Sequence, residues 1–429
     1  MPEVLFESQP VRAGIVCPQV SGRQTSLKGA ERLAETEGLA AAIRLDVVFS
    51  QIVALRQIRP DTYFGRGVVE RLAAAIAETK AELLIVDAAL SPIQQRNLEK
   101  ALNLKVIDRT ALILEIFGER AQTREGTLQV ELAHLTYQRS RLVRSWTHLE
   151  RQRGGAGFLG GPGETQIELD RRIIDDKIVK IKKALEKIKQ TRGLQRTARQ
   201  KVPFPVVALV GYTNTGKSTL FNRLTAAGVF AENLLFATLD TTMRRLVLPS
   251  RREIILSDTV GFISDLPHEL IMAFRATLEE VLNADIVVQV LDASNPENKQ
   301  QRSDVLEVLH QLGLSKIEHQ PNYLELYNKI DLLLPETASR LAAGKNMLAI
   351  SALTGSGMDK FLQWLDAALS QNEKEYTITL AASDGAQLAW LYANAEVISQ
   401  KTQDESLQLL VRMRAAAYQK WRQKFIPGN

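Results

Sequence analysis

The sequence predicts an α/β protein with a doubly wound sheet at its centre. Two observations lead to this prediction. The segment 211–218, GYTNTGKS, fits the pattern G-x-x-x-x-G-K-[ST] and lies between an apolar run at 206–210 and a helical segment that starts at residue 219. Strand-like and helix-like segments also alternate before and after it along the chain. A glycine-rich loop between a strand and a helix is the setting of a phosphate-binding loop, or P-loop.

The chain divides into four predicted parts, and its 429 residues are enough for about three domains of roughly 150 residues. Around the P-loop domain we expect an N-terminal α/β subdomain, an antiparallel coiled-coil arm and a small C-terminal α+β domain. The expected boundaries are 1–120 for the subdomain, 121–200 for the basic arm with a Gly-rich tip at 154–163, 201–371 for the P-loop domain and 372–429 for the C-terminal domain.

The composition, with 45% hydrophobic and 24% charged residues, is that of a globular protein. Cys17 is the single cysteine, so an internal disulfide is excluded and a reducing compartment is expected. The first residues lack a basic region followed by an apolar core, and no run approaches the ~18 apolar residues of a membrane span. We therefore expect a cytoplasmic monomer without a transmembrane segment.

The N-terminal subdomain alternates predicted strands with predicted helices, which favours a small α/β layer. The strands are expected at 45–49, 83–87 and 105–108, and the helices at 68–78 and 94–102. A Gly-rich loop at 59–67 interrupts this pattern. It could hold an anion or an RNA phosphate, and a plain turn with a helix cap fits it equally well.

Two heptad patterns predict the arm. The first comprises Leu128, Leu132, Leu135, Leu142, Trp146 and Leu149, and the second comprises Ile167, Ile174, Ile178, Ile181, Leu185 and Ile188. Between them, six glycines and one proline at 154–163 stop a helix and expose Phe158 and Leu159. An exposed apolar pair suits insertion into a partner, and a simple connector is the alternative.

The arm also carries the basic charge of the chain. Residues 139–201 hold 17 Lys and Arg against 7 Asp and Glu, whereas the whole chain has a net charge of +5. A charge run is often only a solvated helix face. Concentration of one sign on an extended arm favours contact with a nucleic-acid backbone, and RNA is the partner that we expect.

The P-loop itself should hold phosphates. Its glycines let backbone N–H groups wrap the phosphates, and the following helix N-terminus adds partial positive charge. Lys217 should reach the β- and γ-phosphates, and the Ser218 hydroxyl should ligate Mg²⁺. The nucleotide-binding candidates in this loop are Gly211, Tyr212, Thr213, Asn214, Thr215, Gly216, Lys217 and Ser218.

A second candidate segment has no clear periodicity and comprises Phe236, Ala237, Thr238, Leu239 and Asp240. A nucleotide switch needs a hydroxyl that reaches Mg²⁺ only when the γ-phosphate is present. Thr238 is our candidate for this second metal ligand, beside Ser218. Thr241 and Thr242 are close competitors, and the sequence does not separate the three.

A D-x-x-G motif follows the predicted strand at 253–257 and comprises Asp258, Thr259, Val260 and Gly261. Asp258 can hold Mg²⁺ through a water molecule, and the Gly261 N–H can bond the γ-phosphate. The motif alone is weak evidence for a nucleotide site. Its position about 40 residues after Lys217, at the end of a predicted strand, makes it strong evidence. Lys217, Thr238 and Gly261 are thus the catalytic candidates.

Two further motifs select the base. Asn328, Lys329, Ile330 and Asp331 follow a predicted strand, and the Asp331 carboxylate can accept from both N1–H and N2–H₂ of guanine. Adenine lacks this donor pair, so the motif selects GTP over ATP. Asn328 should brace the loop and Lys329 should cover the base. The segment with Ser351, Ala352 and Leu353 should bring a backbone N–H near guanine O6. Together these motifs predict a P-loop GTPase domain.

With these motifs in place, the chain resembles the HflX family of ribosome-associated GTPases, within the Obg–HflX group. The residues that carry the resemblance are 211–218, 236–240, 258–262 and 328–331, together with the glycine-rich tip followed by 163–166. The resemblance implies binding to the large ribosomal subunit and its rRNA, with the arm directed at the peptidyl-transferase region. It also implies splitting or rescue of ribosomes under stress. Some members are linked to ATP use by the N-terminal region, yet residues 1–200 hold no second P-loop motif.

One residue predicts the rate of hydrolysis. Ras-like enzymes use a Gln to orient the attacking water, and this chain has Phe262 in the comparable place. An apolar ring cannot orient water, so we expect slow hydrolysis that a partner accelerates. Asn214 resembles the residue of K⁺-assisted relatives that helps to hold the cation, which adds K⁺ to the expected cofactors Mg²⁺ and GTP. The alternative is that Asn214 only braces the loop.

Two classes of function compete. The first is a ribosome-acting GTPase whose arm contacts rRNA, and the second is a regulatory switch whose coiled coil binds a protein or membrane partner. A tRNA-modifying GTPase is less favoured because the sequence outside the P-loop domain shows no substrate-chemistry motif.

Overall fold

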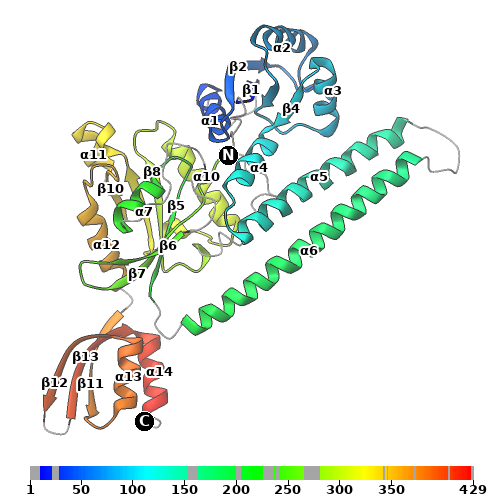
Figure 1. Cartoon of the computed structure of the whole chain (residues 1–429). Helices are drawn as coiled ribbons and strands as arrows, with labels where there is room; N and C mark the ends of the chain where they lie inside the picture. The colour runs from blue at the N-terminus through cyan, green and yellow to red at the C-terminus, as the bar shows by residue number, and fades with distance from the viewer. Residues whose placement is uncertain are drawn as a thin grey trace, which may run out of the picture.

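Figure 1 shows a computed structural model of the chain, which we describe at residues 10–21, 29–152, 162–199, 204–225, 236, 242–264, 281–341, 344, 346–370, 373–403 and 406–426. An N-terminal subdomain, a long two-helix arm, a central domain and a C-terminal domain follow one another. Within the described residues, no helix is long and apolar enough to span a bilayer. The domain boundaries predicted from the sequence for these four parts remain a proposal.

The N-terminal subdomain is a four-stranded parallel sheet in the order β2-β1-β3-β4. Its strands are β1 (Arg12–Val20), β2 (Asp46–Leu55), β3 (Leu83–Val86) and β4 (Lys105–Asp108), and its helices are α1 (Gly29–Ala42), α2 (Arg66–Thr79), α3 (Pro92–Leu102) and α4 (Arg109–Arg120). Residues of α1 and α4 pack in one core, and residues of α2 and α3 in another. The predicted strands and helices are confirmed, whereas β1, α1 and α4 had not been foreseen.

The Gly-rich loop at 59–67 is a turn followed by a helix cap. Arg59 and Tyr63 exchange backbone hydrogen bonds of 3.0 and 3.1 Å between N and O, and Gly65 is the N-cap of α2. This geometry is that of a turn with a helix cap, and binding of an anion or an RNA phosphate by the loop stays a prediction.

The arm consists of α5 (Arg124–Gln152) and α6 (Pro162–Arg199), which run antiparallel side by side (Figure 1). Leu135, Ile178 and Ile181 form a small buried cluster, and four other residues of the predicted heptads pack against it: Leu128, Leu132, Ile174 and Leu185. The α6 helix begins at Pro162 and so includes the last two residues of the predicted tip, because proline is tolerated in a first helical turn. Phe158 and Leu159 lie outside the described residues.

The central domain is a six-stranded sheet in the order β10-β9-β8-β5-β7-β6, in which β6 is antiparallel to β7 and the other described pairs are parallel. The strands are β5 (Val206–Val210), β6 (Thr242–Val247), β7 (Glu253–Asp258), β8 (Ile286–Asp292), β9 (Tyr323–Asn328) and β10 (Met347–Ala349). The helices are α7 (Lys217–Thr225), α10 (Asn298–Gln311), α11 (Pro335–Leu341) and α12 (Met358–Ser370). The order is that of a doubly wound sheet, as predicted.

The C-terminal domain is a three-stranded antiparallel sheet with two helices. It comprises β11 (Glu373–Ala381), α13 (Gly385–Asn394), β12 (Glu396–Gln403), β13 (Ser406–Arg414) and α14 (Ala415–Phe425). Trp421 and Leu391 anchor the helices in its core. The predicted α+β character is correct. The sequence predicts strands at 375–380 and 407–411 and helices at 386–395 and 414–424, which are found, and β12 is the element that it does not indicate.

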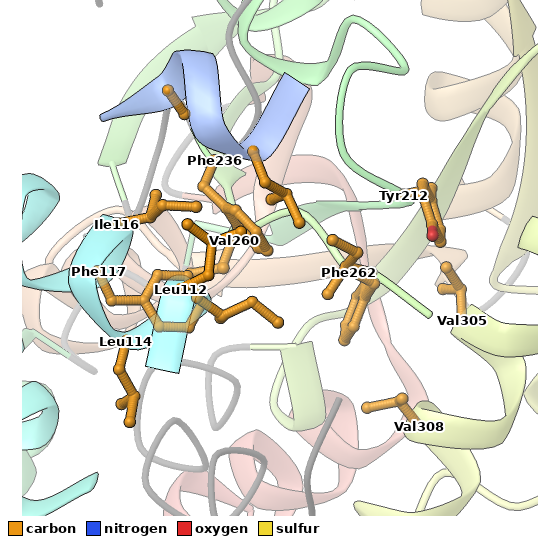
Figure 2. Packing of buried hydrophobic residues seen from close by; sticks show 14 of the residues in the cluster. Leu112, Leu114, Ile116, Phe117, Tyr212, Phe236, Val260, Phe262, Val305 and Val308 are labelled. Carbon is orange, nitrogen blue, oxygen red and sulfur yellow. The ribbon is translucent and has the colours of Figure 1, made fainter. Parts of the chain in front are cut away.

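The N-terminal subdomain and the central domain share one hydrophobic core. Figure 2 shows α4 directing Leu112 and Phe117 toward Phe236 and Phe262 of the central domain. The rings of Phe117 and Phe236 meet edge to face, with centroids 4.8 Å apart. Phe236 and Phe262 belong to the candidate switch segments, so α4 packs directly on the nucleotide switch.

Candidate nucleotide site

The P-loop at 211–218 requires glycine at both its ends. Gly211 has a φ of 151° and Gly216 a φ of 89°. A Cβ at Gly211 would lie 2.3 Å from the backbone oxygen of Val290, and one at Gly216 would lie 2.3 Å from Nδ2 of Asn328. Glycine at these positions lets the loop lie close to β8 and to the last residue of β9.

Lys217 is the buried cation of this loop, with an exposed fraction of 6%. Its Nζ donates to the carbonyl oxygens of Gly211 and Tyr212 at 3.0 and 2.7 Å. Burial lowers the pKa of Lys217 to about 8, and the nearby Asp258 carboxylate opposes this shift only in part. The ammonium is therefore placed inside the loop, where phosphates would bind.

This pKa predicts how nucleotide affinity changes with pH. Phosphates favour the charged ammonium, so binding takes up a proton wherever the unliganded Lys217 is neutral. GDP affinity should stay constant up to about pH 8 and should then fall by up to about tenfold per pH unit. Titration with a fluorescent GDP from pH 7 to 9 measures this effect. A Lys217→Arg variant stays charged and should lose the pH dependence, and a flat profile in the native chain would contradict the prediction.

Two oxygen ligands that suit Mg²⁺ lie together beside the P-loop. The Ser218 hydroxyl donates to Oδ2 of Asp258 at 2.8 Å, and Asp258 is fully buried at the end of β7. A hydroxyl and a carboxylate are the oxygen donors that Mg²⁺ takes from protein beside phosphates. This donor set therefore fits the metal. The next residue, Thr259, donates to the carbonyl oxygen of Leu209 at 2.6 Å, which ties β7 to β5.

The end of the D-x-x-G motif lies directly over the P-loop. A Cβ at Gly261 would be 2.9 Å from Cγ2 of Thr213 and 3.3 Å from Nζ of Lys217. The backbone of Phe262 bonds the loop on both sides, since Thr213 N donates to Phe262 O at 2.7 Å and Phe262 N donates to Gly211 O at 3.0 Å. The Phe262 ring is 4% exposed and belongs to the core that the central domain shares with α4 (Figure 2).

Asn328 joins three loops of the site. Its Nδ2 donates to the carbonyl oxygen of Thr215, and its Oδ1 accepts from the backbone N–H of Ala352, each at 2.8 Å. The Ala352 N–H is thus engaged, which leaves the N–H of Leu353 as the candidate for guanine O6. Asp331 accepts from the Ser351 hydroxyl at 2.5 Å.

The remaining candidates fall into two groups. In the described part of the chain, Thr213, Thr215 and Val260 are buried, Ile330 is half-buried, and Asn214 is exposed with a φ of 58°. Phe236 lies in the shared core, whereas Ala237, Thr238, Leu239, Asp240 and Thr241 lie outside the described residues. Thr242 is the first residue of β6 and pairs with Asp258.

Two supporting residues, Arg223 and Asp292, escaped the sequence analysis. Arg223 of α7 donates to the carbonyl oxygen of Ala352 at 2.5 Å and also to that of Leu353. Asp292 pairs with Lys329 at 2.7 Å between Oδ2 and Nζ. Asp292 ends the apolar run at 286–291, which is a strand signal in the sequence, and the carboxyl ends of parallel strands meet at the ligand edge. Arg223 has no such signal in the sequence.

Comparisons with known proteins decide the family. Four family descriptions match consecutive parts of the chain: "GTP-binding GTPase N-terminal" at 30–118, "GTP-binding GTPase Middle Region" at 120–199, "50S ribosome-binding GTPase" at 206–329 and "HflX C-terminal domain" at 336–425. A protein of Magnetococcus marinus named GTPase HflX is 51% identical over 385 residues, which are 90% of this chain and 88% of that protein. The chain belongs to the HflX family of GTPases.

Other relatives agree with the HflX assignment. GTPase HflX of Escherichia coli K12 is 42% identical over 393 residues, 91% of each chain. A Xenopus laevis protein named putative GTP-binding protein 6 is 35% identical over 426 residues, 96% of this chain and 80% of its own. A solved Sulfolobus solfataricus GTP-binding protein in complex with GDP has a TM-score of 0.44 and 22% identity over 84% of this chain and 99% of its own, which adds nothing to the assignment. As an HflX-family GTPase, the chain is a GTP hydrolase with a P-loop fold.

Proposed function

We propose that this GTPase binds the large ribosomal subunit and its rRNA through the basic arm, under the control of GTP. The observation that carries the proposal is the charge of α6. Its exposed basic side chains in the described range are Arg171, Arg172, Lys177, Lys180, Lys182, Lys183, Lys187 and Lys189. Such a surface on an extended arm suits a phosphate backbone. The family description "50S ribosome-binding GTPase", matched at 206–329, supports the same partner.

The finer proposal is that the protein splits or rescues ribosomes under stress, acting in the cytoplasm as a monomer. The sequence resemblance to ribosome-associated GTPases supports this part. In this proposal the tip at 154–163 reaches the peptidyl-transferase region, and the P-loop domain reports whether GTP is bound.

The nucleotide-site roles belong to the same proposal. The P-loop residues 211–218 bind the phosphates, Asp331 reads guanine, and Gly261 donates its N–H to the γ-phosphate. Mg²⁺ would be held by Ser218 and Thr238, with Asp258 acting through a water molecule, and it would neutralise charge on the β- and γ-phosphates. The Ser218–Asp258 hydrogen bond of 2.8 Å supports the first of these ligands.

The burial of Phe262 supports slow hydrolysis without a partner. Its apolar ring is buried in the core shared with α4, so this side chain offers no hydrogen bond to an attacking water. We propose that ordering of the switch segments on the ribosome accelerates the reaction. The exposed Asn214, in its left-handed conformation, is the proposed contact for K⁺.

Co-sedimentation with large ribosomal subunits tests the proposal. The native chain with a non-hydrolysable GTP analogue should pellet with the subunits, and its affinity should fall steeply with salt. Neutralising Lys180, Lys183 and Lys187, which lie on one face of α6, to glutamine should reduce the logarithmic salt slope by about 2 to 3, at roughly 0.7 to 0.9 for each phosphate contact. The matched control neutralises three exposed lysines elsewhere, Lys360, Lys374 and Lys401.

GTP turnover is measured on the same samples, with and without subunits and in K⁺ or Na⁺. Acceleration by subunits and loss of that acceleration in the arm variant would agree with the proposal. Equal pelleting of the arm variant and the control variant would contradict rRNA contact by the arm. No pelleting of the native chain would favour the alternative, a regulatory switch whose coiled coil binds a protein or membrane partner.

A further inference from the structure

The first residues of α4 lie where the N-terminal subdomain, the arm and the nucleotide switch meet (Figure 1). Asp108 is the N-cap of this helix and accepts from the backbone N–H of Ala111 at 2.9 Å. The same carboxylate binds the arm. Arg141 of α5 donates to it at 2.6 Å, and the Tyr137 hydroxyl donates to it at 2.7 Å. Asp108 is 1% exposed, so the arm is attached to α4 through a buried charge.

The next residue, Arg109, joins two carboxylates of the N-terminal subdomain to the backbone of the central domain. Its guanidinium pairs with Asp87 at 2.7 Å and with Glu35 at 2.5 Å. It also donates to the carbonyl oxygen of Ser264 at 3.2 Å, three residues after Gly261. Arg109 is 4% exposed. Burial alone would lower its pKa, but the two carboxylates raise it, so Arg109 stays charged.

In the central domain, the side chain of Tyr212, the second residue of the P-loop, contacts the same group of residues. Its hydroxyl donates to the carboxylate of Glu35 and accepts from the backbone N–H of Ser264 at 2.8 Å. Both backbone polar groups of Ser264 are therefore held, one by Tyr212 and the other by Arg109. The hydroxyl of Tyr212 remains a donor, because burial and the Glu35 carboxylate raise its pKa.

The geometry points to a relay in which Asp108 and Arg109 couple the position of the arm to the segment that follows Gly261. The two residues are adjacent in a single rigid helix start, and each is bound on a different side. A shift of Ser264 when the nucleotide changes would act on Arg109, and a shift of α5 would act on Asp108. By linkage, arm displacement would alter the switch as much as the nucleotide alters the arm.

The relay assigns positioning roles to residues outside the P-loop domain. Glu35 binds Arg109 and Tyr212, which in turn hold Ser264 beside the loop. Tyr137 and Arg141 connect this arrangement to the arm. The inference rests on the proposed binding of GTP at 211–218 and needs no ribosome. Nucleotide binding measured on the same samples separates failure of that site from failure of the relay.

Two tyrosine-to-phenylalanine variants test the relay, because each removes one hydroxyl and keeps the ring packing. Tyr137→Phe weakens the arm side, and Tyr212→Phe weakens the switch side. Tyr392→Phe is the matched control, since its hydroxyl bonds Gln400 in the C-terminal domain. The readout is the distance between spin labels on the full chain, introduced by Arg172→Cys on the arm and Lys360→Cys on α12.

The single native cysteine does not interfere with this labelling. Cys17 is 2% exposed, and burial, together with the Asp87 carboxylate, raises its pKa to about 12. At neutral pH it is therefore a poor target for a maleimide label, whereas the two introduced cysteines replace exposed residues.

At saturating nucleotide, the label distance in the native background should differ between GDP and a non-hydrolysable GTP analogue. Each variant should reduce this difference by roughly half or more, and the double variant should add little, because both hydroxyls belong to one coupled path. Tyr212→Phe should also lower kcat by roughly 2- to 30-fold. The control should match the native chain.

Three results would overturn the relay. The first is an arm distance that does not respond to nucleotide although nucleotide is bound. The second is a response that survives in both single variants. The third is a double variant whose loss is the product of two independent effects.

Discussion

Replacing Asp331 with asparagine is expected to change the accepted base from guanine to xanthine. A carboxylate accepts from both N1–H and N2–H₂ of guanine, whereas an amide supplies one acceptor and one donor. Xanthine carries an oxygen where guanine carries the amino group, so it complements the amide. The Ser351 hydroxyl, 2.5 Å from Oδ1 of Asp331, can keep the side chain oriented in both forms.

The expected loss of GTP affinity in Asp331→Asn is on the order of 10⁴-fold, because a site built for two donors is left with an unpaired polar group. Competition of GDP and xanthosine diphosphate for a fluorescent GDP measures the change. Asp359→Asn, at an exposed position of α12, is the control and should keep the preference for guanine. If Asp331→Asn still prefers GDP, Asp331 does not read the base.

Replacing Asn328 with alanine should disrupt three loops of the nucleotide site at once. The side chain is 2% exposed and bonds both the Thr215 carbonyl and the Ala352 N–H. Each group loses its buried partner, at a cost of about 1 to 3 kcal/mol apiece, so the free energy of unfolding should fall by about 2 to 6 kcal/mol. Denaturant unfolding measures this change, and GDP affinity should fall with it because the P-loop loses its support.

Asn322 provides the matched control, since it lies at the opposite end of the same strand. Its Nδ2 donates to the carbonyl oxygen of Asp285 at 3.1 Å, away from the nucleotide loops. Asn322→Ala should cost about 1 to 3 kcal/mol of stability and leave GDP affinity unchanged. Equal losses of affinity in the two variants would show that Asn328 has no special role at the site.

The strands that carry the nucleotide motifs could be predicted because their signals are local. The predicted run at 206–210 coincides with β5, and Asp258 ends β7 as expected. Parallel strands are buried on both faces and therefore read as continuous apolar runs. In contrast, β12 has mostly exposed side chains and no such run, and it escaped prediction.

The position of Phe262 shows where local reasoning reached its limit. Its sequence context indicated correctly that the residue offers no hydrogen bond to water. The ring is nevertheless better described as part of the core shared with α4, beside Phe236 and Val260 (Figure 2). A residue that looked like a missing catalytic group is thus also a packing contact between two parts of the chain.

The sequence by itself determined the family, the order of the nucleotide motifs and the basic character of the arm. Each of these depends on residues that are close together in the chain or on a simple count of charge. Only the tertiary structure decided that Glu35 and Tyr212, 177 residues apart, share a hydrogen bond, and that Arg109 reaches Ser264. No spacing pattern in the sequence predicts such contacts, because residues of two separate domains meet only when the chain has folded. The packing of these two domains against each other also connects the arm to the candidate switch segments through α4.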